Sequence, residues 1–179
     1  MFYQRGGKAP IARSVLGEAE SGDPQSQAKA AANFFFGLDG FPQDFEKAAH
    51  WAKLAADKDN PDGQYMYAMC LHGGSGLAQN LMMAEAWYLM AAQNGNEEAQ
   101  YMAGTFLFLT RTERCKWLLL AAESSFDATA KMAKDELALL KPTLSDSQIK
   151  DAEDSAMLWK RLRRLSSEVR GPLFSDGKR

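Results

Sequence analysis

A tryptophan, an alanine pair and a glutamine recur along this chain at nearly one period, and this repeat restricts the fold more than any other feature. The tryptophans are Trp51, Trp87 and Trp117, with the last interval shorter than the first. The glutamines are Gln27, Gln64 and Gln100, at almost equal intervals. Periods of this length are typical of repeat proteins, in which each unit buries its apolar face against its neighbours. We therefore expect Trp51 and Trp87 to occupy equivalent buried positions.

Helix start signals precede each of the three glutamines. Polar residues that can accept a hydrogen bond from a free helix amide lie four residues before them, as Asp23, Asn60 and Asn96. Pro24 and Pro61 then fall at the first helical position, where a missing N–H costs nothing. Gly22 and Gly95 can adopt the left-handed conformation that ends the preceding helix, and Asp59 replaces this glycine in the middle copy.

A second, glycine-rich break divides the first two units at residues 37–42 and 73–77, and the third unit lacks it. Each unit is thus predicted as a helix, a glycine loop, a helix and a tight turn. At 179 residues the size favours one domain. Its expected parts are an N-terminal half-repeat at 11–22, repeats at 23–59 and 60–95, a loop-shortened repeat at 96–125, capping helices at 127–169 and a flexible tail at 170–179.

The second helix of the unit carries a family pattern. Residues 42–51, Pro-Gln-Asp-Phe-Glu-Lys-Ala-Ala-His-Trp, followed by Ala55 and Ala56, resemble the second half of a Sel-one-like repeat, and residues 78–95 resemble it again. The resemblance covers residues 11–125. It implies an all-α, right-handed helical-repeat solenoid of antiparallel helix pairs, related to tetratricopeptide repeats. It also implies a scaffold or adaptor that binds a protein partner, as is common for such repeats in bacteria.

The C-terminal part predicts two further helices. The first covers residues 127–140, and the second starts at a capping box formed by Ser145 and Gln148. An apolar stripe at spacings of three and four follows, made of Ile149, Ala152, Ala156, Trp159, Leu162, Leu165 and Val169. We expect this long helix to cap the open end of the solenoid, with Leu162 and Leu165 in the seal and the arginines outward.

The charge is unevenly distributed. Residues 160–179 contain seven basic and two acidic side chains, a balance of +5, so the segment 1–159 sums to −7 within the net charge of −2. The clustered side chains Lys160, Arg161, Arg163 and Arg164 suggest nucleic-acid binding as one alternative. The acidic body, and the lack of aromatic residues between the arginines, favour instead a charged outer face that docks on the body.

Catalytic and metal-binding patterns are missing from the sequence. His72 lies two residues from Cys70, but no second pair of ligands at zinc spacing exists, and no nucleophile elbow or phosphate loop accompanies the glycines. We therefore predict a protein that is not an enzyme, with no metal, cofactor or small-molecule substrate. Cys70 and Cys115 fall in predicted helices as buried thiols. Without an apolar segment of membrane length or a signal peptide, we expect a cytoplasmic protein.

The first helix of each unit should line the concave face of the solenoid. The tetratricopeptide relatives imply open positions one, five and eight residues after the glutamines: Ala28, Ala32 and Phe35; Tyr65, Met69 and His72; Tyr101, Thr105 and Phe108. Their larger side chains suit protein binding, so we predict partner contacts at Phe35, Tyr65, Met69, His72, Tyr101, Thr105 and Phe108. The alternative is that a neighbouring helix covers this stripe.

Two forms of protein binding are consistent with the resemblance. One is an adaptor or scaffold, and the other is a cytosolic immunity or antitoxin protein that neutralises a toxin or secreted effector.

Overall fold

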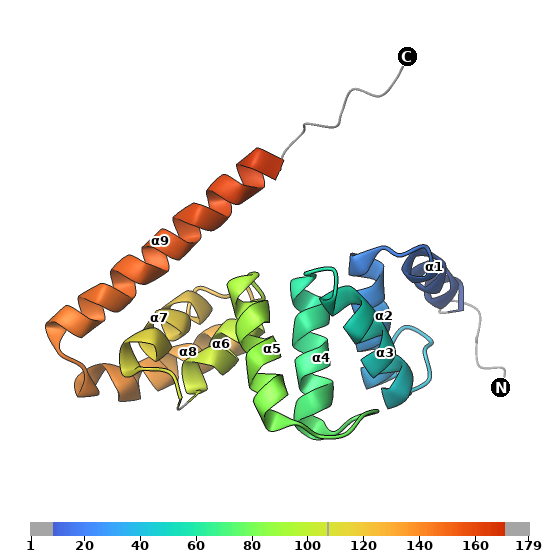
Figure 1. The fold of residues 1–179 in the computed structure, drawn as a ribbon, viewed down its shortest axis with the longest axis horizontal. Coiled ribbons are helices and arrows are strands. Elements are labelled where there is room, and N and C mark those ends of the chain that lie inside the picture. The colour runs from blue at the N-terminus through green and yellow to red at the C-terminus, as the bar shows by residue number, and fades with distance from the viewer. Residues whose placement is uncertain (1–8, 107, 171–179) are drawn as a thin grey trace, which may run out of the picture.

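The computed structural model describes residues 9–106 and 108–170, which fold into helices and turns without a strand (Figure 1). The α-helices are α1 (Ala9–Glu20), α2 (Pro24–Phe36), α3 (Phe45–Ala56), α4 (Pro61–Gly73), α5 (Leu81–Gln93), α6 (Glu97–Thr105), α7 (Arg111–Ala121), α8 (Asp127–Leu140) and α9 (Asp146–Arg170). A single 3-10 turn, Lys141–Thr143, separates α8 from α9. This part of the chain is the expected all-α, right-handed solenoid of antiparallel helix pairs.

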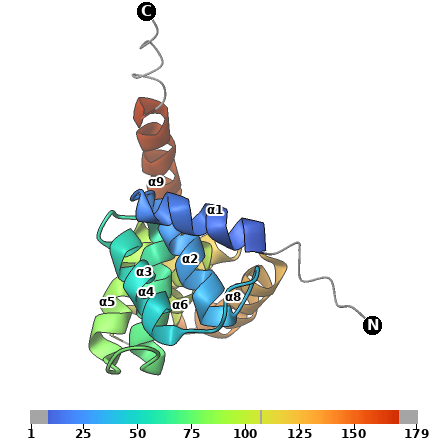
Figure 2. The ribbon, with the colours of Figure 1, turned by 90° about the vertical axis from the view of Figure 1, so that its right-hand side faces the viewer.

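The repeat units are the pairs α2–α3, α4–α5 and α6–α7, and each helix packs on its neighbours in sequence. The view from the N-terminal end places α3 and α5 on one side of the solenoid, with α2 and α4 beside them and α8 on the other side (Figure 2). The first helices of the units therefore line one face, which α8 partly covers.

Local capping chemistry sets the helix starts, as the sequence predicts. The three cap side chains accept a hydrogen bond from the backbone N–H three residues later, at 2.6 Å for Asp23, 2.8 Å for Asn60 and 2.8 Å for Asn96. The turns before them need a left-handed residue. Gly22 and Gly95 have φ of 98° and 96°, and Asp59 adopts the same region at 57°.

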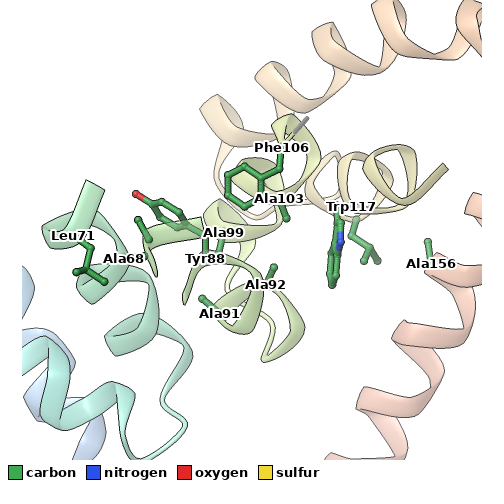
Figure 3. Close-up of a cluster of buried hydrophobic side chains, with 12 residues drawn as sticks. Ala68, Leu71, Tyr88, Ala91, Ala92, Ala99, Ala103, Phe106, Trp117 and Ala156 are labelled. Atoms are coloured by element: carbon green, nitrogen blue, oxygen red, sulfur yellow. The ribbon is translucent and has the colours of Figure 1, made fainter. Parts of the chain in front are cut away.

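The largest cluster of buried apolar side chains crosses the molecule from α4 to α9. It extends from Leu71 in α4 through Tyr88 in α5 and Phe106 after α6 to Trp117 in α7 and Ala156 in α9 (Figure 3). Alanines fill the space between these larger groups, which allows the helices to approach closely.

The repeat tryptophans are less uniformly buried than the sequence predicts. Trp117 is only 3% exposed because α9 covers it, with the ring of Trp159 at 6.4 Å. Trp51 and Trp87 share the same degree of burial, as expected for equivalent positions, but both are half-buried and pack against the edges of buried clusters. Lys53 lies over Trp87, with its Nζ 6.0 Å from the ring centroid.

Helix α9 begins at the predicted capping box, where Ser145 N–H donates to Gln148 Oε1 at 3.0 Å and Gln148 N–H donates to Ser145 Oγ at 3.3 Å. Its first half caps α7, and Ala152 and Ala156 are buried there. The helix then projects beyond the body in both views (Figures 1 and 2).

The predicted position of Leu162 and Leu165 in the seal is wrong, since they are 54% and 45% exposed. The underlying helix α7 ends before α9 does, so Leu162 and Leu165 lack the cover that Ala152 and Ala156 have. The side chain of Val169 and residues 171–179 of the predicted flexible tail lie outside the described part of the chain.

Candidate partner-binding groove

A groove of about 610 Å³ opens on the face formed by the first helices of the units. Its walls come from α2 (Gln25, Ala28, Lys29, Ala32, Phe36), from α4 (Asp62, Tyr65, Met66, Met69), from the start of α6 with the turn before it (Gly95, Asn96, Glu97, Glu98) and from Phe126 before α8. The groove thus spans the first helices of three repeat units and ends at the cap residue of α8.

The floor of the groove is apolar and firmly supported. Tyr65 and Met69 are half-buried and pack against the central cluster, and the Tyr65 ring lies 5.7 Å from that of Tyr88. Burial raises the pKa of the Tyr65 hydroxyl. Two aromatic rings remain open at the ends, since Phe36 is 52% and Phe126 is 53% exposed. A partner would therefore meet a preformed floor between two exposed rings.

A hydrogen-bond ladder connects the units along one edge of the groove. The cap Asn60 of the second unit donates from Nδ2 to Gln25 Oε1 of the first at 3.1 Å. The cap Asn96 of the third unit likewise donates to Asp62 Oδ1 of the second at 3.0 Å. Gln25 Nε2 also donates to Asp62 Oδ2 at 3.3 Å. The cap asparagine of one unit thus donates a hydrogen bond to a side chain of the previous unit. In both cases the acceptor residue stands two positions before the repeat glutamine of its unit.

Glu98 occupies the same position in the third unit, and the ladder stops there. The cap of α8, the helix that follows the third unit, is Phe126, which offers no side-chain hydrogen bond. Burial raises the pKa of the half-buried Glu98 carboxyl. A hydrogen bond from its own backbone N–H opposes this rise, and the neighbouring charges of Asp62 and Glu97 add to it. This carboxylate lines the groove without the amide partner that its counterparts have.

Glu97, the next carboxylate along the edge, is bound within the fold. Its Oε2 accepts hydrogen bonds from Ser124 Oγ at 2.7 Å and from Ser125 N–H and Oγ at 2.7 and 2.9 Å. Burial opposes ionisation, but these hydrogen bonds outweigh it and lower the pKa of Glu97. Glu97 therefore fastens the turn before α8, whereas Glu98 faces the groove.

Comparison with protein families identifies two copies of one repeat. The Sel1 repeat model matches residues 24–60 and 61–96, which contain α2 to α5 and the capped turns between them. Residues 24–96 thus form two Sel1 repeats. Sel1 repeats are in general non-catalytic modules for protein–protein interaction. A comparison with curated proteins found no significant match.

Two solved structures share this fold. A protective antigen present in uropathogenic Escherichia coli strains, which displays an SLR fold, is 20% identical with a TM-score of 0.70, over 94% of this chain and 37% of that one. A Sel1 repeat protein from Oxalobacter formigenes is 21% identical with a TM-score of 0.63, over 86% of this chain and 48% of that one. This chain therefore spans less than half the length of either structure. At these identities the likeness concerns the fold.

The groove brings together part of the predicted binding stripe of the Sel1 units. Tyr65 and Met69 line it, together with Ala28 and Ala32. Phe35 does not line it, because this side chain turns toward α3, where its ring lies 5.2 Å from that of Phe45. The first two units thus supply the shared floor.

The predicted residues around the third unit lie outside the groove lining. Tyr101 is half-buried against the cluster that includes Ala133 and Leu137 of α8, which covers this part of the concave face. Thr105 is half-buried, and its Oγ1 donates to the backbone oxygen of Met102 at 2.7 Å. The open stripe therefore ends where α8 begins.

The last two residues of the predicted stripe are exposed but separate from the groove lining. The His72 ring lies 6.1 Å from that of Tyr88 at the end of α4. Phe108 stacks on Phe106 with ring centroids 5.5 Å apart, between α6 and α7.

Sequence reasoning missed the polar edge and the two aromatic ends. A signal for the edge was present, because Gln25, Asp62 and Glu98 all stand two residues before a repeat glutamine. Phe126 was also detectable, since it follows Asn96 by the same shortened interval that separates Trp87 from Trp117 and occupies the position of a cap. The missed residues are thus equivalent positions of the Sel1 unit.

The described residues contain no group of three or more His, Cys, Asp or Glu side chains that could hold a metal ion. Cys70 and Cys115 are buried free thiols, and burial raises the pKa of Cys70 to about 11. Among the described helices, none is both long and apolar enough to cross a membrane.

Proposed function

We propose that this Sel1-repeat chain is a non-enzymatic scaffold that binds a protein partner through the groove across α2, α4 and α6. The observation that carries the proposal is an open apolar floor, built by Tyr65 and Met69, between the exposed rings of Phe36 and Phe126. Aromatic and methionine side chains are enriched at the centres of protein interfaces, where they contribute most of the binding energy.

The packing beneath the groove supports binding to a preformed surface. Tyr65 rests against Tyr88, and Met66 is buried below the same floor. Side chains held in this way lose little conformational freedom when a partner binds, so more of the contact energy remains as affinity. The segment of the partner that enters would be a loop, a terminus or one helix, because the groove is narrower than a domain.

An adaptor and an immunity protein are two forms of this proposed function, and both would act in the cytoplasm of a bacterial cell. The identity of the bound protein distinguishes them, since a toxin or secreted effector would indicate immunity. The basic face of α9 is a weaker candidate, because part of it already contacts the body. Lys160 pairs with Glu123 at 2.8 Å, and Arg163 lies over Trp159 and donates to the Gln93 carbonyl.

The test is affinity capture with the full chain, followed by mass spectrometry and a binding measurement with the captured protein. Replacing Tyr65 and Met69 by alanine should weaken binding by about 30-fold or more, since anchors at an interface centre cost about 2 kcal/mol or more when truncated. The matched control replaces Leu81 and Met82, exposed apolar residues of α5 outside the groove. Equal binding by both double variants would refute the groove as the site.

A further inference from the structure

The broken end of the hydrogen-bond ladder carries an inference about the partner's chemistry. In the first two units a cap asparagine from the next unit donates to Gln25 or Asp62. Glu98 is the third residue of this series, and Phe126 takes the place of its donor. The groove therefore ends at a half-buried carboxylate next to an exposed aromatic ring.

The charge around Glu98 is one-sided. Three carboxylates, those of Asp62, Glu97 and Glu98, line this end of the groove. None of the ion pairs found among the described residues includes any of the three. The single basic residue of the lining is Lys29, which belongs to α2 at the other side. A cation that entered here would gain from all three charges.

We infer that the partner segment carries an arginine or lysine that binds Glu98, next to an apolar side chain that packs on Tyr65 and Phe126. The inference rests on the proposed function of the groove and adds the chemistry of the bound segment. The cation takes the position of the absent asparagine amide, and its N–H groups donate to the carboxylate. Arginine suits the site better than lysine, because its planar group can also lie against an aromatic ring.

Three labelled synthetic peptides test this inference by fluorescence anisotropy. They share a sequence with two leucines and differ only at two intervening positions, which are arginine, glutamine or glutamate. We expect the arginine peptide to bind about tenfold tighter than the glutamine peptide at about 50 mM salt, with the glutamate peptide weakest. The difference should shrink at about 500 mM salt, where exposed charges are screened.

Two variants connect the charge preference to this corner of the groove. Glu98→Gln should lower the affinity ratio of the arginine and glutamine peptides, and the charges of Asp62 and Glu97 account for the preference that remains. Phe126→Asn should do the same, because the new amide can donate to Glu98 and complete the ladder. Glu85→Gln is the control, since Glu85 is also half-buried but lies on α5 outside the groove lining, and it should leave the ratio unchanged.

The outcomes separate this inference from the proposed function. If the arginine and glutamate peptides bind alike and both depend on Tyr65, the groove binds partners but the charge preference is wrong. If no peptide binds at about 1 mM, a free energy weaker than about −4 kcal/mol, the inference is overturned. The proposed function is then tested by the captured partner alone, from the loss of its binding when Tyr65 and Met69 are replaced.

Discussion

Gly63 lies in close contact with a neighbouring helix, and replacing it by alanine tests the packing directly. Gly63 lies in the first turn of α4, against the last turn of α3. A Cβ at this position would overlap the Cβ of Ala55 and would lie 2.9 Å from the backbone carbon of Ala55 and from the nitrogen of Ala56. These are backbone atoms and a methyl group, so no side chain can rotate away.

Two opposing terms decide the effect of Gly63→Ala. Alanine gains about 0.5–1 kcal/mol over glycine in a helix through the unfolded chain's lower entropy. Overpacking in a tight contact costs about 1–3 kcal/mol, and the rigid neighbours place this site toward the upper end. We therefore expect a net loss of about 1–2 kcal/mol in the free energy of unfolding, or roughly 3–6 °C in melting temperature for a chain of this size.

Gly17→Ala is the matched control, because nothing lies within 4 Å of a Cβ built at this helical position in α1. It should stabilise the protein by about 0.5–1 kcal/mol, the opposite sign. Urea unfolding followed by circular dichroism measures both variants against the parent. If Gly63→Ala were as stable as the parent, α3 and α4 would have to pack less closely than the structure indicates, and the reasoning would be refuted.

Further outcomes follow from the same structure. Trp117→Ala should destabilise the protein by about 3–5 kcal/mol and Trp51→Ala by clearly less, as judged by urea unfolding, and equal losses would contradict their different burial. Leu162→Gln should leave the melting temperature within about 1 °C of the parent, because the residue is exposed and such substitutions change stability little. Glu98→Gln should raise the free energy of unfolding at pH 7 relative to the parent. Because the pKa of Glu98 is raised above its ordinary value of 4.5 in the folded protein, the parent loses stability as the pH rises above that value and the carboxyl ionises. The stability advantage of Glu98→Gln over the parent should therefore vanish below about pH 4, where the carboxyl is protonated. Cys70 should react with a disulfide reagent at least about 100-fold slower in the native protein than in urea, because its thiolate is scarce and buried, and a fast native reaction would show that the helix opens.

The sequence predicts the helix starts well because their causes are local. Asn60 and Asn96 bind amides three residues away, and Ser145 and Gln148 bind each other, so the neighbouring residues contain the whole interaction. The repeat spacing then places Tyr65 and Met69 on one face, because equivalent positions of stacked units share a surface. These features depend on the order of residues along the chain and on the period.

The missed features depend on where one helix ends relative to another. Periodicity places Ala156 and Leu162 on a similar apolar stripe of α9, yet only the first is buried. The reason is length, since α7 has 11 residues and α9 has 25, a difference of about 20 Å at 1.5 Å per residue. Tyr101 shows the same limit, because its exposure is set by α8, whose position over the third unit is not encoded near Tyr101 itself.

The shortened third unit explains why the groove ends where it does. Without a glycine loop, the chain returns to the concave side after a shorter segment than in the first two units, and the turn before α8 meets the start of α6. Glu97 binds Ser124 and Ser125 in that turn, which holds Phe126 at the edge of the groove. The cap position no longer needs an asparagine to fix the turn, so an aromatic ring can stand there and close the groove. Phenylalanine in place of asparagine at this cap position also removes the hydrogen-bond donor for Glu98. One change in the repeat therefore produces both the apolar end of the groove and the carboxylate beside it.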